Sequence, residues 1–449
     1  MKRFKRVNIL LGVLALLGIV TLVITNVETK KETIRNSEDV ILQISYDSVT
    51  TLSWKYDGNS FSFHKDDTWL YDTDTTFPVD EDTIKSMLSL FESFGVSFAI
   101  EDVEDYSQYG LQNPICTINV GTSEETYQLK LGDYSTMDSQ RYVSIGDGNV
   151  YLVSSDPLDF FDVQLKDLLL NDAIPAMEQV TKIQFSGSEN YTVVYEPDSE
   201  RTVCADDTYF TSNGKALDSE RVNSYLSNLQ YMSLTDYMTY SASDGDLSTY
   251  GMDSPELNIA VTYETEETEA SVILHLSRDP SESKDSDTVT VYARVDDSPI
   301  IYQIDQTYYE ALMQASYNDL RHHEIITAEL TDITQFDFTL DGSTCSILTK
   351  EEDGVWSCYY EDKNVVASDL SGAITSLSVS EFTSVSPTEK EEIHFIAYLD
   401  NETFPQIEVA FYRHNGESCL AVVDGETLGL VSRSSVVDLI EAVNSIILG

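Results

Sequence analysis

Cysteine is scarce in this chain of 449 residues, which has five cysteines and no CxxC pair. An odd and widely spaced set of this kind excludes a small fold held together by a framework of disulfides. One pairing stays open, because Cys345 and Cys358 flank an expected hairpin turn at residues 352–354. Glycine-rich phosphate loops are also absent, so we expect any ATP to be handled by another subunit.

Basic residues are few, since the sequence has 26 Lys and Arg against 78 Asp and Glu. Residues 36–449 carry 76 acidic and 19 basic residues, a net charge of −57. Such a surface repels phosphate backbones and anionic headgroups, which argues against nucleic-acid binding. The charge favours solubility through self-repulsion, and the alternative is attraction of cations or of a basic partner.

The composition is nevertheless that of a folded protein. Hydrophobic residues make up 41% and aromatic residues 10% of the chain, including 27 tyrosines, which is enough for apolar cores. The roughly 414 residues after position 35 predict two to four domains.

The longest uncharged stretch runs from residue 7 to residue 27 and consists mostly of Leu, Val and Ile. Its 21 residues match the roughly 20 that cross a hydrocarbon core as one helix. Four basic residues precede it, and neither a small-residue cleavage site nor a nearby cysteine follows it, so we predict an uncleaved single-pass anchor in the cell membrane. Residues 1–6 are then a cytoplasmic basic tip, residues 28–44 are a linker, and the remainder is extracytoplasmic.

Catalytic motifs are missing, since the sequence contains neither HExxH nor GxSxG. Two SxxK matches, at residues 62–65 and 281–284, fall in an expected strand and an expected loop. Ser and Lys there do not share the helical turn that their chemistry needs. The adjacent His322 and His323 point apart on any regular element, and we interpret them as exposed polar residues between two units. We predict no catalytic, cofactor-binding or metal-binding residue.

One acidic run superficially resembles a calcium-binding loop, with carboxylates at Asp72, Asp74, Asp80 and Asp82. A loop of this type has glycine at its sixth position and a bidentate Glu at its twelfth. A phenylalanine and a threonine stand at those two positions here. The run therefore predicts loose surface association of calcium rather than a dedicated site.

The chain repeats itself, and the first sign is a helix that begins in a similar way three times. Each helix has an apolar face at i, i+3, i+4 and i+7, and the first residue of that face stands five positions after another apolar residue. The three apolar faces are Ile84, Met87, Leu88 and Phe91; Val222, Tyr225, Leu226 and Leu229; and Leu370, Ala373, Ile374 and Leu377. In the first of these helices Asp80 is the expected N-cap. We expect Ile84 and Val222 to occupy equivalent places in one shared fold.

A second repeated motif is Tyr-Gly-apolar-x-x-Pro, which occurs twice. Its defining residues are Tyr109, Gly110 and Pro114, and then Tyr250, Gly251 and Pro255. We interpret the motif as a structural corner between a helix and a strand. The glycine supplies a positive φ, and the proline stands at the strand's start, where its missing N–H costs nothing. The alternative is a role of the two tyrosines in binding.

These landmarks predict an α+β fold, with three tandem units of antiparallel sheet and helices after the transmembrane helix. The units span residues 45–172, 178–322 and 328–449, and the last is divergent because it lacks the Tyr-Gly motif. Strands are expected to begin at Ile115 and Glu256, directly after the prolines. Each unit is expected to close with a helix, over residues 157–170, 306–320 and 434–447.

In their order along the chain, these features resemble the bacterial family called domain of unknown function (DUF) 4340. The resemblance is carried by the helix start, the Tyr-Gly corner, the Leu-x-Leu-Gly strand end at residues 129–132 and Val-Tyr-x-Val at residues 150–153. It is clearest over residues 45–322. It implies a membrane-anchored protein, of a kind often encoded beside ABC exporter components of the gliding-motility type, with an accessory role outside the membrane and no catalytic residues.

Tandem units suit an extended surface for partners better than a single catalytic centre. The function we expect is therefore that of a membrane-anchored extracytoplasmic interaction module, accessory to an ABC-type export system and its permease. The alternative is a stand-alone cell-envelope protein that binds a wall polymer or peptide, and a third candidate is an uncharacterised hydrolase that uses scattered acids. No cofactor is expected for any of them.

Overall fold

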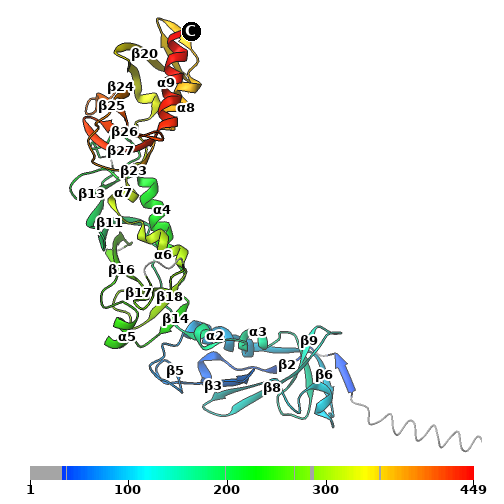
Figure 1. The fold of residues 1–449 in the computed structure, drawn as a ribbon. Coiled ribbons are helices and arrows are strands. Elements are labelled where there is room, and N and C mark those ends of the chain that lie inside the picture. The colour runs from blue at the N-terminus through cyan, green and yellow to red at the C-terminus, as the bar shows by residue number, and fades with distance from the viewer. Residues whose placement is uncertain are drawn as a thin grey trace, which may run out of the picture. The chain divides into compact units, whose positions relative to one another are not determined.

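A computed structural model of the chain describes residues 33–36, 38–197, 199–266, 268–283, 288–352 and 355–448. It contains two compact units, of which the first comprises Met1–Asn171 with Thr235–Ser241 and the second comprises Asp172–Leu234 with Ala242–Gly449. The described residues form three antiparallel sheets with few helices, an α+β fold that is mostly sheet (Figure 1).

The first unit contains the first sheet, whose strands run in the order β1-β6-β10-β9-β8-β7-β3-β4-β5, with β2 also paired to β6. The strands are β1 (Thr33–Asn36), β2 (Val40–Leu42), β3 (Val49–Tyr56), β4 (Asn59–Lys65), β5 (Trp69–Tyr71), β6 (Phe94–Glu101), β7 (Cys116–Thr122), β8 (Thr126–Ser135), β9 (Gln140–Ser144) and β10 (Val150–Val153). Strands β3 and β4 form a hairpin because Asp57 and Gly58 both have positive φ, as a two-residue turn between twisted strands requires.

The first helix of this unit, α2 (Glu81–Ser89), begins at the residue that its sequence predicts. Asp80 is extended and its carboxylate accepts a hydrogen bond from the Asp82 amide, which caps the helix. The apolar face of Ile84, Met87 and Leu88 is buried, in agreement with the sequence pattern. Short 3₁₀ turns complete the unit: η1 (Tyr46–Ser48), η2 (Leu90–Ser93) and η3 (Tyr106–Tyr109).

The predicted closing helix over residues 157–170 is wrong in its second half. Only α3 (Leu158–Phe161) and the 3₁₀ turn η4 (Leu165–Leu168) form. The Leu170 amide donates to the Pro78 carbonyl at 2.8 Å, and the Asp80 amide donates to the Leu168 carbonyl at 2.9 Å. Because these backbone groups are used by a distant segment, the helix cannot continue through them.

The second unit contains the second sheet, in which the strands follow the order β13-β12-β11-β15-β16-β17-β18. These strands are β11 (Gln179–Ser186), β12 (Asn190–Tyr195), β13 (Tyr209–Thr211), β15 (Leu257–Glu264), β16 (Glu269–Arg278), β17 (Val291–Val295) and β18 (Ile301–Ile304). The helices beside them are α4 (Ser219–Gln230), α5 (Asp244–Thr249), α6 (Gln306–Met313) and α7 (Tyr317–Leu320). The predicted helix over residues 306–320 is thus two helices, because Ser316 is extended and starts α7 with its own capping box.

The strand β14 (Asp236–Thr239) belongs to the first unit although it lies between α4 and α5 in the sequence. Tyr240 donates a hydrogen bond of 2.7 Å to the Asp74 carboxylate, and its ring meets Phe77 edge-on at 5.1 Å. Lys166 and Asp236 form an ion pair of 2.8 Å.

The third sheet also lies in the second unit, and its order is β22-β21-β20-β19-β24-β25-β26-β27-β23. Its strands are β19 (Ile333–Leu340), β20 (Ser343–Glu352), β21 (Val355–Tyr360), β22 (Lys363–Val365), β23 (Val379–Phe382), β24 (Glu391–Leu399), β25 (Gln406–Arg413), β26 (Ser418–Val423) and β27 (Glu426–Ser432). They follow the 3₁₀ turn η5 (Leu330–Asp332), and the helices are α8 (Ser368–Thr375) and α9 (Arg433–Leu448). Here the predicted closing helix over residues 434–447 is confirmed.

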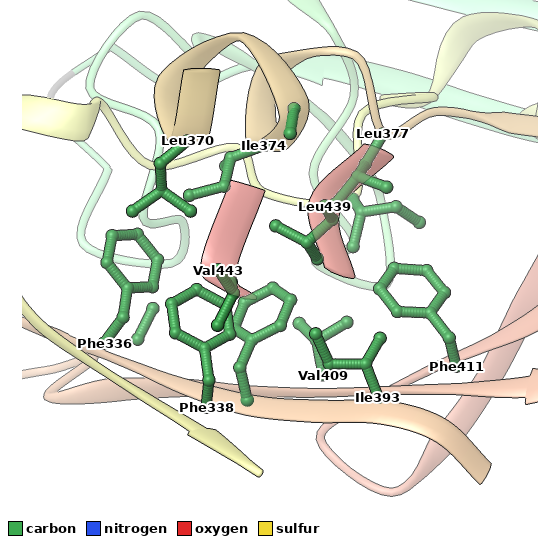
Figure 2. Close-up of a cluster of buried hydrophobic side chains, with 14 of the residues drawn as sticks. Phe336, Phe338, Leu370, Ile374, Leu377, Ile393, Val409, Phe411, Leu439 and Val443 are labelled. Atoms are coloured by element: carbon green, nitrogen blue, oxygen red, sulfur yellow. The ribbon is translucent and has the colours of Figure 1, made fainter. Parts of the chain in front are cut away.

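The core of the third sheet lies between its strands and the pair of helices α8 and α9 (Figure 2). Leu370 and Ile374 from α8 and Leu439 and Val443 from α9 point toward aromatic and branched side chains of the strands, among them Phe338. Helix pairs also pack together beside the other two sheets, as α2 with α3 and α4 with α6. Helices therefore cover one face of each sheet.

The three sheets share one strand order. The series β10-β9-β8-β7-β3-β4-β5 in the first sheet corresponds to β18-β17-β16-β15-β11-β12-β13 in the second and to β27-β26-β25-β24-β19-β20-β21 in the third. In each series the strand that comes first along the chain pairs with the first of a later group of four strands. These pairs are β3 with β7, β11 with β15 and β19 with β24. The third sheet has this order although its sequence lacks the Tyr-Gly motif.

The predicted membrane anchor at residues 7–27 lies outside the described residues. In the part of the chain that the structure does describe, no helix is both long and apolar enough to cross a membrane.

The five cysteines are all free thiols. The open pairing of Cys345 with Cys358 does not form, because the register of β20 and β21 places Thr349 opposite Cys358, while Cys345 lies opposite Phe338 of β19. Burial raises the pKa of the Cys358 thiol to about 11, which keeps it protonated at neutral pH.

Candidate functional site

The first Tyr-Gly corner joins η3 to the strand β7. Gly110 ends the turn with φ of +71°, in the left-handed region, and its amide donates to the Ser107 carbonyl at 3.1 Å. Asp105 caps the start of the turn by accepting a hydrogen bond of 2.9 Å from the Ser107 amide. The corner is thus fixed at both ends by hydrogen bonds that backbone amides donate.

The second corner has the same construction. Gly251 follows α5 with φ of +72°, and its amide donates to the Ser248 carbonyl at 3.3 Å. The Ile115 amide donates to the Leu131 carbonyl and the Glu256 amide to the Leu276 carbonyl, both at 2.9 Å. The strands themselves begin one residue later than expected, at Cys116 and Leu257, because this first hydrogen bond precedes the regular ladder.

Both corner tyrosines use their rings for packing. Tyr109 is 8% exposed, and its ring lies 4.9 Å from the ring of Tyr142 on β9. Tyr250 is half-buried, and its ring lies 4.9 Å from that of Tyr292 on β17. The prolines Pro114 and Pro255 are also half-buried and stand two residues before their strands.

No larger residue fits at the corner glycines. A Cβ atom on Gly110 would lie 2.8 Å from the backbone nitrogen of Asp133 and 2.6 Å from its carboxylate carbon. On Gly251 it would lie 2.4 Å from the hydroxyl oxygen of Ser277. These positions are constrained by close approach as well as by φ, which supports the structural interpretation of the motif.

A groove of about 410 Å³ borders the second corner, and its lining includes Gly251, Arg278 and Asp279. Its one arginine is already paired, since the Arg278 guanidinium donates to both oxygens of Glu256, with a shortest distance of 2.8 Å. Tyr309 donates to the same carboxylate. This pairing neutralises the cation that an anionic ligand would need.

The acidic run at residues 72–82 does not converge on one point. Asp72 hydrogen-bonds Ser62 and His64, with 2.5 Å between its Oδ1 and His64 Nδ1. Asp74 binds Thr76 and Tyr240, while Asp80 caps α2. Because the carboxylates of Asp72, Asp74 and Asp80 serve different partners, the run lacks the shared cavity of a calcium loop.

The interpretation of His322 as an exposed residue between units is wrong. Its side chain is 20% exposed, and its Nε2 forms a hydrogen bond of 2.8 Å with Oδ1 of Asp207, whose side chain is 1% exposed. His323 instead directs its Nε2 to the Asn318 carbonyl at 3.1 Å. The two adjacent histidines therefore serve different partners, and only His322 reaches the interior.

His322 is the centre of a mixed cluster of ligand-type side chains. Each of the three residues Cys204, Asp207 and His322 offers one donor atom, and these atoms all lie within 4.8 Å of one another. On the other ring nitrogen, Nδ1, the carboxylates of Asp218 and Glu324 lie at 3.9 and 3.7 Å. Thiol, carboxylate and imidazole groups are donor types of protein metal sites, and this cluster of described residues combines all three.

The electrostatics of the cluster favour a charged imidazole. Burial by itself lowers the pKa of His322, but hydrogen bonds to Asp207 and Cys204 and the charges of Asp207 and Asp218 raise it to about 10.

The sequence offered one signal for this site. The connection between the second and third strands is 196–208 in the second sheet but only 66–68 in the first.

Comparison with known families identifies one. The model described as "Domain of unknown function (DUF4340)" matches residues 69–255 and, a second time, residues 209–395. The second match starts and ends the same number of residues after the first. This number is close to the separation between Tyr109 and Tyr250. No curated protein and no solved structure matches the chain.

Proposed function

The chain belongs to the DUF4340 family, and on that premise we propose that it is a membrane-anchored interaction module outside the cytoplasm, accessory to an ABC-type export system. The observation that carries the proposal is repetition: three sheets share one strand order, and the family model matches twice at a constant offset. A repeated module multiplies a partner-binding surface, whereas a catalytic centre needs convergence in one place.

The finer organisation is part of the proposal. Residues 45–172, 178–322 and 328–449 act as three tandem α+β units behind a transmembrane helix at residues 7–27. The 21 uncharged residues after a basic tip support the anchor, and the direction follows from the basic residues before it. The third unit is supported by its strand order and by the family match that extends to residue 395.

Charge indicates the chemistry of the partner. Residues 36–449 carry a net charge of −57, and such a field accelerates encounter with a basic surface and repels an anionic one. Ion pairs such as that between Arg141 and Asp156, at 2.7 Å, neutralise few of the acidic residues. We therefore propose that the module meets a basic extracytoplasmic face of the export permease, and that this association weakens as salt rises.

Topology is the first point to test. Protease added to intact, wall-stripped cells is expected to degrade the chain beyond about residue 40 while the first residues stay protected, since the roughly 30 Å hydrocarbon core separates the two sides. A soluble mature form that starts near Asn26 would contradict the uncleaved anchor.

The partner is tested by co-purification of the affinity-tagged full chain from cross-linked native membranes. We expect a multispan permease and its ATPase to be recovered with the chain. The matched control replaces residues 1–35 by an unrelated single-span anchor and keeps residues 36–449 unchanged. Recovery of the permease by both chains supports the proposal, and recovery only through the native anchor contradicts it.

Two other results would replace the proposal. Binding of the chain to isolated wall material, with no protein recovered from membranes, identifies a stand-alone envelope-binding protein. Hydrolysis of such material by the purified chain identifies an enzyme.

A further inference from the structure

We propose that Cys204, Asp207 and His322 form a binding site for one Zn²⁺ ion. The site lies in the second unit, between the loop that precedes β13 and the segment that follows α7. It goes beyond the proposed function, because metal binding is independent of any partner.

The donor set fits zinc better than it fits the hard cations. Zn²⁺ combines thiolate, imidazole and carboxylate ligands, whereas Ca²⁺ and Mg²⁺ take oxygen ligands almost alone. In a tetrahedral site the donors lie roughly 3.3–3.8 Å apart, since zinc bonds measure about 2.0–2.3 Å. His322 Nε2 and Asp207 Oδ1 are 2.8 Å apart, and the three donor atoms lie within 4.8 Å of one another. Small side-chain rotations therefore bring them to tetrahedral spacing.

The loop that carries two of the ligands is held in place by its own hydrogen bonds. Thr202 Oγ1 donates to Oδ2 of Asp207 at 2.8 Å, and the Cys204 amide donates to Thr202 Oγ1 at 3.2 Å. The Asp207 amide donates to the Cys204 carbonyl at 3.2 Å. Because Thr202 binds the other carboxylate oxygen, Asp207 presents Oδ1 toward His322, as a monodentate ligand requires.

The surroundings of the imidazole match those of metal-bound histidines. A histidine that binds metal through one nitrogen usually gives the proton on its other nitrogen to a carboxylate, which fixes the ring. Here zinc takes the place of the proton that Nε2 shares with Asp207, so that binding releases this proton, while Nδ1 faces Glu324 at 3.7 Å and Asp218 at 3.9 Å. Asp218 is also the cap of α4, so Glu324 has more freedom to accept this proton.

The ligand-bearing loop distinguishes the second sheet from the other two. Residues 196–208 connect β12 to β13, whereas residues 66–68 connect β4 to β5, and in the third sheet β20 ends at Glu352 and the equivalent strand β21 begins at Val355. A longer connection in one of three related sheets calls for a local purpose. Two of the three proposed ligands lie on it.

Zinc at this place would tie the second sheet to the third. Val203, beside the ligand Cys204, packs against the core of the third sheet. Just after His322, the amide of Ile325 donates to the carbonyl of Leu377 at 3.0 Å. A metal bond across the cluster therefore stabilises the junction between the two sheets.

The experiment measures zinc binding by the full chain, purified in detergent and freed of metal by a chelator. Zn²⁺ is titrated in competition with a chromophoric chelator, and Co²⁺ is added separately to report thiolate ligation by its near-ultraviolet absorption. We expect one zinc per chain, a cobalt–thiolate band and a higher midpoint of thermal unfolding with zinc. Cys204→Ser is expected to abolish the band, and His322→Gln to weaken zinc binding at least 100-fold.

Two kinds of variant complete the test. Glu324→Gln changes a half-exposed side chain and is expected to weaken zinc binding roughly tenfold, the usual effect of losing the partner of a metal-bound histidine. The matched controls Cys345→Ser and His394→Gln remove a free thiol and a histidine elsewhere in the same unit, and both should bind zinc like the parent. Thermal unfolding without metal checks that each variant is folded.

The proposal is overturned if the metal-free parent takes up no zinc at micromolar concentration. It is equally overturned if zinc binds but Cys204→Ser keeps the cobalt–thiolate band, or if the controls lose zinc as much as the ligand variants do. In those cases His322 and Asp207 form only an ion pair. A failure to recover any permease in the co-purification leaves these outcomes unchanged.

Discussion

Gly110→Ala tests the corner most sharply, because two separate costs can be read from the structure. A left-handed backbone costs an L-residue roughly 1–2 kcal/mol. The added methyl group would also lie 2.8 Å from the backbone nitrogen of Asp133, which cannot move aside as a side chain end can. Overpacking of this kind costs roughly 1–3 kcal/mol more. We therefore expect a total loss of roughly 2–5 kcal/mol in the free energy of unfolding of the first sheet.

The matched control is Gly58→Ala in the hairpin turn of the same sheet. Gly58 also has a positive φ, of +81°, but a Cβ atom there meets nothing within 4 Å. Only the backbone cost applies, so the expected loss is about 1–2 kcal/mol. The difference between the two variants isolates the close approach of Asp133.

Tryptophan fluorescence follows the unfolding in denaturant. Trp54 and Trp69 lie in the first sheet and are each 2% exposed, whereas Trp356 lies in the third. A Trp356→Phe background makes the signal specific for the first sheet, and linear extrapolation gives the two free energies. Equal losses for the two glycine variants, or a loss below about 1 kcal/mol for Gly110→Ala, would refute the steric argument.

Three further changes have defined outcomes. Tyr109→Phe should cost only about 0.5–1.5 kcal/mol of stability and leave partner binding intact, because the ring packs inside; a lost partner with an unchanged melting temperature would assign the tyrosine to binding. Glu392→Gln should cost about 1–2 kcal/mol at pH 7, since the carboxylate accepts hydrogen bonds from Arg413 and Arg433. Burial opposes ionisation of Glu392, but these hydrogen bonds outweigh it and lower its pKa below the usual 4.5, so the difference from the parent in urea unfolding should shrink as pH falls below that value. Leu439→Ala should cost about 2–5 kcal/mol, measured by calorimetry, because the fully buried side chain leaves a cavity between α9 and the third sheet (Figure 2).

The features that the sequence alone predicts well are those set within a few residues. The start of α2 depends on Asp80 and on amides one turn away, and its buried face depends on a spacing of three and four residues. The hairpin turn at Gly58 is equally local. The repeat also allowed a prediction beyond such local features. The two occurrences of one motif, at Tyr109 and at Tyr250, indicated a shared corner without any knowledge of contacts.

Tertiary structure decided whatever depends on groups that are far apart in the sequence. The helix expected up to residue 170 breaks because the Leu170 amide bonds to the carbonyl of Pro78. The interpretation of His322 failed for the same reason, since its partner Asp207 is 115 residues away and no spacing rule connects them. Local propensities act along the chain, whereas hydrogen-bond pairing and burial act across space, and only the folded sheets bring those groups together.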